Sequence, residues 1–530
     1  MRLGWPGRAA LSSCSLLLAY ACGARTELKP GKVLAEGGAG GEPAASAGEP
    51  GVPEPECQTS LDCPSDDLCA RPGCVEGQCV MLAPVDCSDD DPCTKDSCDP
   101  TTGACLHDAP VDADGDGFDA VTTDVAGCGD DCNDNDAAIH PLATELCDGE
   151  DNDCDGTVDD GTTISYAGFE PVRVSSLELE RAARGGFARS GATLGVNYTG
   201  LSGSRWRSYF AEIDPSGLQL GETRLVNDIN ADTYAGLLAW TGEAHATVWT
   251  DARQDGNYEI YFNRLTPQGE KLDADLRVTD APDFSLHPAL LTLGEDVLVA
   301  WDDRRWEDIG GAKAQIYGVR IGAGGIVSPE QTLTADNEEA EYPVLAASKT
   351  RLGMAYTVLD ELGTVHGRFK TFDHQFSLAS DALDFASAEA QEPSIALVGD
   401  FFVVTWQTYA VGPGPAIMGA VYSQEGAVII NPHALTNGAA HARSHTLLSL
   451  GDRFVLVWAD DLDGNYELYS QVMDAQLNVL RTRERITFDP ADSLSPAALV
   501  TSGGGIGILF DDWRSGPRQV YYTRLECNSP

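Results

Sequence analysis

The 530-residue sequence predicts a mainly β protein in which a seven-bladed β-propeller follows small disulfide-rich modules and an acidic segment. Three observations support this prediction. Thirteen of the 16 cysteines lie between residues 57 and 154. Residues 108–161, the acidic segment, contain 18 Asp or Glu and no Lys or Arg. From residue 165 onward, short apolar segments recur at a nearly constant interval, as in propellers and other repeat proteins.

Charge and size limit the classes of function. The chain has 83 acidic and 34 basic residues, which gives a formal net charge of −49. This balance excludes nucleic-acid binding through bulk charge and disfavours adhesion to anionic lipids, because both need Lys and Arg. The length is typical of about two to four domains. Hydrophobic residues make up 42% of the chain, which is enough for at least one large core.

Residues 1–21 have the pattern of a signal peptide. A basic start is followed by an apolar run over residues 9–21, which is too short to span a bilayer. Residues 18–22 resemble a bacterial lipobox, although Tyr20 stands where a small residue is usual. The resemblance implies a lipid anchor on Cys22 that holds the protein in the outer membrane or at the cell surface. The alternative is an ordinary signal peptide and a secreted protein.

Residues 22–56 are rich in Gly, Ala, Pro and Glu and contain almost no large apolar side chain. Such a segment cannot bury enough surface to offset the entropy lost on ordering. We therefore expect a disordered linker after Cys22.

Residues 57–107 contain a duplicated cysteine pattern. Its copies are related, in their first three positions, by a shift of 24 residues: Cys63, Cys69, Cys74 and Cys79, then Cys87, Cys93, Cys98 and Cys105. Each copy is too small to hold a core without cross-links. Zinc is the alternative use of four cysteines, but the C-x-x-C pairs of zinc ribbons are absent here. We predict disulfides within each copy, with the pairing open, in an oxidising compartment. The modules resemble cysteine-rich repeats of myxobacterial surface lipoproteins.

In the acidic segment, oxygen-bearing side chains occur on alternate residues. The copies are Asp112, Asp114 and Asp116 before Gly117, Asp151, Asp153 and Asp155 before Gly156, and Asp131, Asn133 and Asn135 without a glycine. This spacing, with glycine where the loop turns sharply, is typical of calcium loops. Two carboxylates about 5 Å apart repel by roughly 3 kcal/mol at an effective dielectric of about 20, so a packed structure needs a cation. Thr123 and Thr162 replace the Glu that ends an EF-hand loop, so an EF-hand is not indicated.

Residues 112–161 resemble the MopE-type metal-binding motif and the calcium-wrapping repeats of thrombospondins. The resemblance implies that the ligands are Asp112, Asp114, Asp116, Asp131, Asn133, Asn135, Asp151, Asp153, Asp155 and Asp159. Calcium is favoured because these ligands are hard oxygens. Copper prefers imidazole or sulfur, but His140 is the only imidazole in the segment and its cysteines are expected to be oxidised. We expect a structural role for the ion, and a solvated acidic linker is the alternative.

Seven aromatic residues mark the repeats of residues 165–530. They end apolar segments at intervals of 50 to 55 residues, at Tyr198, Trp249, Trp301, Tyr356, Trp406, Trp458 and Phe510. Each repeat contains four predicted antiparallel strands, which form one propeller blade. The last repeat lacks its fourth strand, but residues 171–175 have the pattern of one and precede the first repeat. We therefore predict that residues 171–175 close the ring. Cys527 is the sole cysteine of residues 165–530, and we predict that it bonds to the cysteine-rich part of the chain.

Three repeats carry Asp and Arg two residues apart after the marker aromatic: Asp251 and Arg253, Asp303 and Arg305, and Asp512 and Arg514. The pattern resembles the Trp-x-Asp-x-Arg…Ile-Tyr repeats of exported bacterial propellers. The pairs either fix the hairpin between the second and third strands or form a charged face that binds an acidic sugar or peptide.

Catalytic motifs are missing from the sequence, which contains no H-E-x-x-H, no G-x-S-x-G and no phosphate-binding loop. Adjacent carboxylates such as Asp302 and Asp303 do not establish the separated pair that glycoside hydrolysis needs. We predict a non-catalytic surface lipoprotein that binds calcium through its acidic segment and displays the propeller to a protein or glycan. The alternative is an extracellular glycan-processing hydrolase of the propeller class.

Overall fold

Strands dominate the computed structural model, which describes residues 56–63, 65, 67–89, 94–108, 112–121, 129–227, 231–254, 256–305, 313–335, 338–409, 414–436 and 441–528. The predicted signal peptide, Cys22 and the linker up to residue 55 lie outside the described residues. The chain divides into two units. In the first, the described residues up to Asp86 join Cys98–Ala104; the second contains Cys87–Ser97 and the chain from Cys105 onward. None of the described residues form a helix that is long and apolar enough to cross a bilayer.

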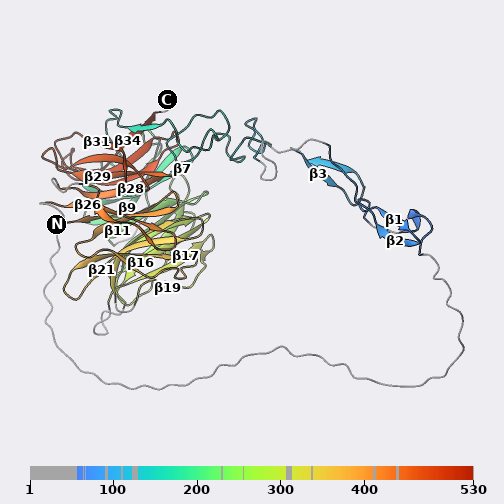
Figure 1. Cartoon of the computed structure of the whole chain (residues 1–530). Helices are drawn as coiled ribbons and strands as arrows, with labels where there is room; N and C mark the ends of the chain where they lie inside the picture. The colour runs from blue at the N-terminus through green and yellow to red at the C-terminus, as the bar shows by residue number, and fades with distance from the viewer. Residues whose placement is uncertain are drawn as a thin grey trace, which may run out of the picture. The chain divides into compact units, whose positions relative to one another are not determined.

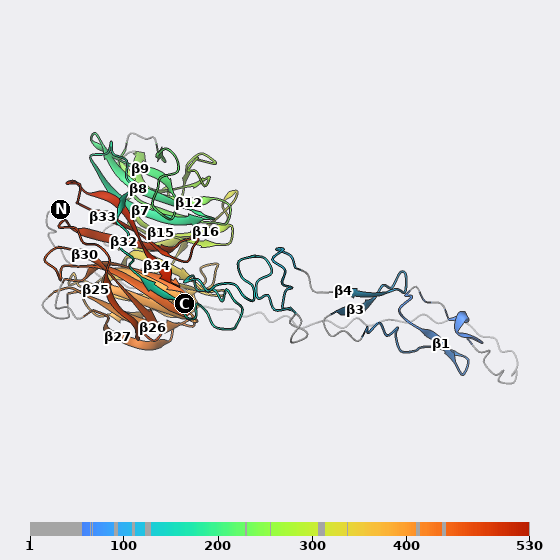
Figure 2. The same ribbon diagram turned by 90° about the horizontal axis from the view of Figure 1, so that it is seen from above.

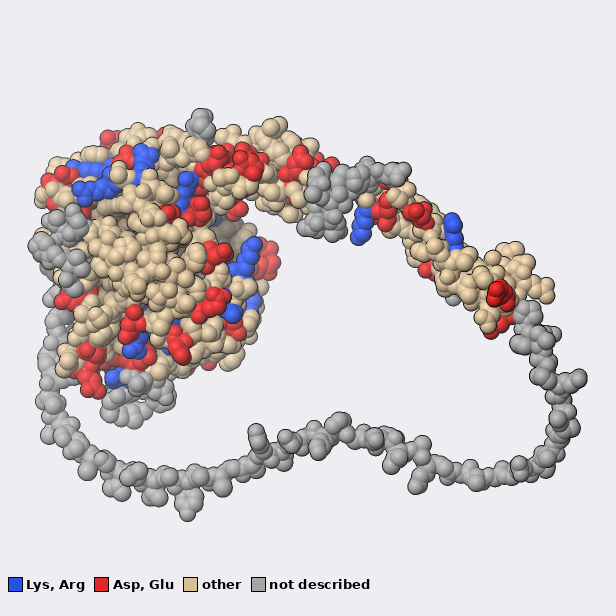
Figure 3. Space-filling model, in the orientation of Figure 1, with Lys and Arg blue, Asp and Glu red and all other residues tan. Residues whose placement is uncertain are grey.

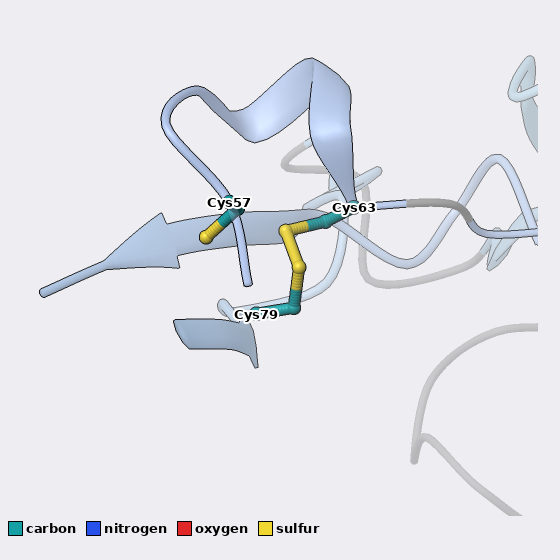
Figure 4. A group of neighbouring side chains, drawn as sticks. All are labelled: Cys57, Cys63 and Cys79. Atoms are coloured by element: carbon teal, nitrogen blue, oxygen red, sulfur yellow. A yellow bond between two sulfur atoms is a disulfide. The ribbon is translucent and has the colours of Figure 1, made fainter. Parts of the chain in front are cut away.

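Disulfides hold the first unit together. It contains a 3-10 turn, Ser60–Asp62, and a hairpin of β1 (Pro72–Val75) and β2 (Gln78–Met81). Its bonds are Cys57–Cys74, Cys63–Cys79 and Cys69–Cys98. Cys57, Cys63 and Cys79 lie close enough to share a metal ion, but all three are oxidised. Figure 4 shows the bond between Cys63 and Cys79; the partner of Cys57 is Cys74. Disulfide sulfur is not a thiolate ligand, so these three residues form no zinc site.

The disulfide pairing differs from the predicted one. The bond between Cys69 and Cys98 joins the two sequence copies, and Cys57, which lies outside both, bonds to Cys74. Pairing confined to each copy is therefore wrong for these residues, because spacing does not determine which sulfurs meet in space. In the second copy, Cys87 bonds to Cys105, and β3 (Lys95–Cys98) pairs with β4 (Cys105–Asp108).

Seven antiparallel sheets form the predicted seven-bladed propeller (Figures 1 and 2). From the innermost strand outward, blades 1 to 3 are β7 (Arg181–Ser190), β8 (Thr193–Ser202), β9 (Arg205–Ile213) and β10 (Arg224–Leu225); β11 (Thr233–Trp240), β12 (His245–Gln254), β13 (Asn257–Leu265) and β14 (Leu276–Arg277); and β15 (Ser285–Leu293), β16 (Asp296–Asp303), β17 (Gln315–Gly322), β18 (Gly325–Ile326) and β19 (Gln331–Thr332).

Blades 4 to 7 have the same order. They are β20 (Glu339–Ala347), β21 (Leu352–Leu359), β22 (Val365–Phe372) and β23 (Leu383–Ala386); β24 (Gln391–Val398), β25 (Phe401–Thr408), β26 (Ala416–Ser423) and β27 (Val428–Ala434); β28 (Arg443–Leu450), β29 (Arg453–Asp460), β30 (Glu467–Asp474) and β31 (Val479–Arg485); and β32 (Ser493–Val500), β33 (Ile506–Asp512) and β34 (Gln519–Asn528).

A strand from before the first blade completes the last one. β6 (Val172–Arg173) pairs with β34 at Tyr521 and Tyr522, which confirms the predicted ring closure by residues 171–175. A second strand, β5 (Thr163–Ser165), was not predicted; it pairs with the end of β34. Both strands cover backbone groups of β34 that would otherwise form an open sheet edge.

The apolar core consists of seven clusters of buried residues, each shared by two neighbouring blades. One of them joins blades 7 and 1, with Leu509 packed near Val196 and Tyr198, so the core also closes into a ring. The seven marker aromatics lie on the second strands and are all at most 2% exposed. Each marker therefore fills space between blades, which explains its recurrence.

The innermost strand of every blade has an irregularity at the same place. Its register shifts by one residue, between the residue pairs Arg184/Phe187, Tyr234/Leu237, Leu286/Ala289, Glu341/Val344, Gln391/Ser394, Arg443/Thr446 and Leu494/Ala497. Five residues in these bulges have a positive φ without being glycine: His287, Tyr342, Glu392, Ser444 and Ser495. Such backbone costs roughly 1–2 kcal/mol per residue and often marks functional sites.

Strand direction gives the ring two faces. At the hairpin face, innermost strands such as β20 begin and second strands such as β21 end. At the opposite disulfide face, β28 ends at Leu450, β29 begins at Arg453 and β34 carries Cys527 near its end. The bulges lie near the start of each innermost strand and hence toward the hairpin face.

Candidate metal centre

The acidic segment is attached to the disulfide face of the propeller. Cys147 bonds to Cys527, as predicted for the C-terminal cysteine. Gly149 packs on the turn at Gly451, so closely that a Cβ at either glycine would clash with the other chain segment. Figure 3 shows acidic side chains without basic ones on the part of the chain that adjoins the propeller, whereas both kinds mix on the propeller itself.

The first acidic loop is folded by its own carboxylates. Asp112 accepts hydrogen bonds from the backbone of Gly115 (2.7 Å) and Gly117 (3.1 Å). Asp114 accepts one from the backbone of Asp116 (3.2 Å), and Asp116 accepts one from the next residue but one. Gly117 has the positive φ, 98°, that the sharp turn requires. These bonds occupy one oxygen of Asp114 and one of Asp116 and leave the other free.

Backbone pairing brings Asp131 to this loop. A parallel bridge joins Ala120 to Asp131, and the backbone of Val121 donates to the carbonyl of Asp131 at 2.8 Å. The approach is tight at Gly129, where a Cβ would lie 1.9 Å from the carbonyl oxygen of Ala120. Only glycine fits there, so the third oxygen-rich copy of the sequence joins the first instead of forming a separate loop.

Three carboxylate oxygens in this arrangement are buried and have no donor. Among the described residues, none donates a hydrogen bond to Oδ2 of Asp114, Asp116 or Asp131. One ligand atom of each of the three residues lies within 4.8 Å of the others. Burial raises the pKa of Asp114, as do the carboxylates of Asp116 and Asp131, against the hydrogen bond from the backbone of Asp116. A cation between the three oxygens satisfies all of them at once.

The second complete loop has the same local fold. Asp151 accepts hydrogen bonds from the backbone of Asp155 (3.1 Å) and Gly156 (2.8 Å), and Asp153 and Asp155 each accept one from a residue two positions on. Glu145, which sequence reasoning missed, accepts a bond from the backbone of Asp153 (2.8 Å). Its Oε2 is buried without a donor among the described residues, and burial raises its pKa.

Several predicted ligands have other contacts. Asn133 and Asn135 are joined by a backbone hydrogen bond, in which the carbonyl of Asn133 accepts from the backbone N–H of Asn135 at 2.6 Å. Asp134, which was not among the predicted ligands, accepts from the backbone of Ala113 at 2.7 Å and lies within ligand distance of Asp112 and Asp114. Asp134 stands between Asn133 and Asn135, at an intervening position of the alternating pattern, so the pattern did not select it.

Asp159 holds the acidic segment on the propeller. Its buried carboxylate pairs with Arg453 of β29 at 2.8 Å and accepts hydrogen bonds from the backbone of Asp148 and Gly149, both at 3.0 Å. Arg453 also donates to the side chain of Thr162 at 2.8 Å. The structure thus gives Asp159 an anchoring role that differs from the predicted one of a loop ligand, because a cation from the propeller already neutralises it.

The described cysteines near these loops are oxidised, and the described imidazole makes other contacts. Cys132 bonds to Cys154, which ties the loop at Asp131 to the second loop. The imidazole of His140 stacks on Phe118 with ring centres 4.9 Å apart, and its Nδ1 lies 2.9 Å from the carbonyl oxygen of the next residue. Among the described residues, these contacts leave oxygen as the main donor atom at the loops.

The Asp and Arg pairs of the repeats lie in separate blades, where each pair is closed on itself. The carboxylates of Asp251, Asp303 and Asp512 are at most 1% exposed and contact the guanidinium of Arg253, Arg305 and Arg514 at 2.6 to 2.8 Å. Burial opposes the charge on these arginines, but their carboxylate partners outweigh it and raise the arginine pKa.

Each Asp also accepts a hydrogen bond from its blade: from the indole of Trp249, the indole of Trp301 or the hydroxyl of Ser493. Blade 6 has Leu462 in place of the Arg, and there burial raises the pKa of Asp460. These contacts support the interpretation that the pairs fix the hairpin. A ligand that drew an Arg away would leave a buried charge, at a cost of about 3–5 kcal/mol.

Residues 131–160 match the family model Cu-binding_MopE, whose description is "Putative metal-binding motif". The match begins at Asp131, so the first acidic loop, which the resemblance had included, lies outside it. The search of curated proteins gives no match.

Solved structures that resemble the chain include a protein of unknown function from Dyadobacter fermentans (13% identity, 70% of this chain and 100% of that chain, TM-score 0.43). Others are an alpha-L-arabinanase of Penicillium chrysogenum complexed with arabinobiose (11%, 60% and 99%, 0.42) and the β-propeller domain of the Trilobed protease of Pyrococcus furiosus (8%, 65% and 95%, 0.41). These likenesses concern the fold alone. The chain therefore combines a seven-bladed propeller with a segment that matches a metal-binding motif.

Proposed function

We propose that the acidic segment binds calcium as a structural ion and that the propeller is displayed beyond it to bind a protein or glycan, without catalysis. The observation that carries the metal assignment is the set of buried Oδ2 atoms of Asp114, Asp116 and Asp131. Three carboxylates brought together without Lys or Arg in the segment repel one another unless a cation lies between them. Calcium accepts six to eight oxygen ligands in flexible geometry, so backbone carbonyls and water complete the shell.

The attachment of the segment supports a stiffening role. The bond Cys132–Cys154 joins the two acidic loops, and Cys147–Cys527 joins the segment to the propeller. An ion between Asp114 and Asp131 therefore links residues 112–121 to a part of the chain that is already fixed on the disulfide face. Calcium would order the connection between the cysteine-rich modules and the propeller.

We also propose that a lipid on Cys22 anchors the protein in the outer membrane or at the cell surface. The support is in the sequence: the apolar run over residues 9–21, the lipobox-like residues 18–22 and the linker that follows. The extensive disulfide bonding is in keeping with an exported protein.

The test of the metal assignment compares two neighbouring carboxylates. Asp131→Asn removes one charged ligand and should weaken calcium binding by about tenfold or more, as measured by isothermal titration calorimetry of the whole chain. Asp130→Asn removes the same charge from an exposed position next to it and should change the affinity by less than about twofold.

Equal weakening in the two variants would show that calcium responds only to the overall negative field. An absence of calcium binding in the unmodified chain would overturn the proposal outright. An unchanged temperature of thermal unfolding of the propeller in both variants checks that neither change acts through misfolding.

A further inference from the structure

A cavity of about 380 Å³ opens between blades 4 and 5 at the hairpin face. Its walls come from the starts of β20 and β24 and from the hairpin between β21 and β22. The lining residues are Glu339, Glu341, Tyr342, Thr357, Leu359, Val365, Ala390, Gln391 and Glu392. Its volume lies in the range of small-ligand sites, and it belongs neither to the metal loops nor to the Asp and Arg pairs.

The bulge positions beside this cavity differ from the rest of the ring. At the first bulge position, blades 3, 4 and 5 carry His287, Tyr342 and Glu392, whereas blade 1 carries glycine and blades 6 and 7 carry serine. A purely structural role predicts the same residue type in each repeat. The positive φ is shared with the serines of blades 6 and 7, but three reactive or aromatic side chains occur only in the consecutive blades 3 to 5, which indicates a local binding surface among the described bulges.

Contacts beneath the cavity hold Tyr342 in place. Its ring stacks on the imidazole of His287 with centres 3.9 Å apart, and its backbone donates to Asp302 at 3.2 Å. Nδ1 of His287 lies 2.7 Å from the same carboxylate, which is fully buried. Asp302 is therefore a positioning residue, and Tyr342 remains 47% exposed as a fixed aromatic surface.

The charge of the lining is negative. The lining residues include three carboxylates, Glu339, Glu341 and Glu392, and no Lys or Arg. Arg304, which is not among the lining residues, pairs with Glu341. Desolvation raises the pKa of Glu341 and of Glu392, although Arg304 acts against it for the former and Arg184 and Arg443 for the latter. A cation in the cavity would lower the cost of keeping these carboxylates ionised.

We propose that this cavity binds the cationic side chain of a polypeptide, lysine or arginine, which makes the partner of the displayed propeller a basic protein. The inference rests on the proposed display function. The carboxylates recognise the charge, and the face of Tyr342 offers a cation–π contact. Leu359, Val365 and Ala390 provide an aliphatic wall for the methylene stem. A sugar would place hydroxyls without partners against that wall.

The experiment measures binding of trilysine, triarginine, triglutamine and the glucosamine trisaccharide to the whole chain by calorimetry. Trilysine or triarginine should bind, and triglutamine should not. Tyr342→Ala and Glu392→Gln should each lower the affinity for the cationic peptide by about tenfold. The controls are Tyr234→Ala, an exposed tyrosine beside the bulge of blade 2, and Glu361→Gln, an exposed glutamate in the β21–β22 turn. They should change binding by less than about twofold.

Glu361→Gln matters because a chain with net charge −49 attracts any cation. Equal weakening by Glu392→Gln and Glu361→Gln would show that the peptides respond only to the overall negative charge of the chain, and would overturn the proposal. An absence of binding of both cationic peptides would overturn it as well. If the glucosamine trisaccharide bound more tightly than the cationic peptides, the cavity would be assigned to a cationic glycan, and the proposal of a polypeptide partner would be overturned. Calcium titration of the same samples separates these failures from failure of the metal assignment, and thermal unfolding of each variant checks that its propeller is folded.

Discussion

Replacing both Cys147 and Cys527 with serine is expected to lower the free energy of unfolding of the propeller by about 4 kcal/mol. The two residues are 380 positions apart, so their disulfide encloses the whole ring and limits the unfolded chain more than any short cross-link does. Cys147 is also fully buried in the cluster that contains Leu450 and Ile506. Denaturant unfolding measures the loss, and hydrogen exchange should rise first in β5 and the end of β34.

The matched control removes the disulfide between Cys132 and Cys154, which are only 22 positions apart and lie in the acidic loops. That double serine variant should weaken calcium binding more than it destabilises the propeller. If the variant without the Cys147–Cys527 bond left exchange in β5 unchanged, the acidic segment would not be fixed to the ring in the way the contacts indicate.

Arg453→Met is expected to cost about 3–5 kcal/mol of stability, because it leaves the carboxylate of Asp159 buried without its cation. That carboxylate has no exposed surface, and the methionine replaces the apolar stem of the arginine without its charge. Adding Asp159→Asn to the same chain removes the charge and should restore much of the loss. Thermal or denaturant unfolding of the two single variants and the double variant gives the coupling energy directly.

Arg481→Met serves as the surface control in the same blade. Arg481 is 38% exposed and lies 3.7 Å from its partner Glu484, so its loss should cost less than about 1 kcal/mol. A similar cost for both arginines, or no recovery in the double variant, would contradict the anchoring role of Asp159.

The repeat architecture could be predicted from the sequence because it rests on residues that recur. The marker aromatics fill the contacts between blades, and β6 completes the last blade as the missing strand required. The bond of Cys527 to the cysteine-rich region could also be predicted, because a lone cysteine after a long cysteine-free stretch needs a partner from that region.

Contacts between copies could not be predicted from spacing. Asp131 joins Asp114 and Asp116 through a backbone bridge at Ala120, and the alternating pattern of each copy contains no information about that bridge. For the same reason the spacing placed Asp159 in a loop, although an arginine nearly 300 positions later determines its role.

The cavity at the hairpin face could not be predicted from the repeats, because repeats are recognised by residues that are the same in each copy. His287, Tyr342 and Glu392 occupy equivalent bulges but are chemically different, so they disappear in an alignment of the blades. The available signal was the proline that directly follows each of them, Pro288, Pro343 and Pro393. Likewise, adjacent Asp302 and Asp303 point to different partners, His287 and Arg305, and do not act as a pair.

Anomalous diffraction from crystals grown with calcium tests the central assignment most directly. The account predicts a peak between Asp114, Asp116 and Asp131, with an oxygen of each at about 2.3–2.6 Å from the ion. A map with no peak there, in crystals where the three oxygens are instead hydrogen-bonded to water, would contradict it.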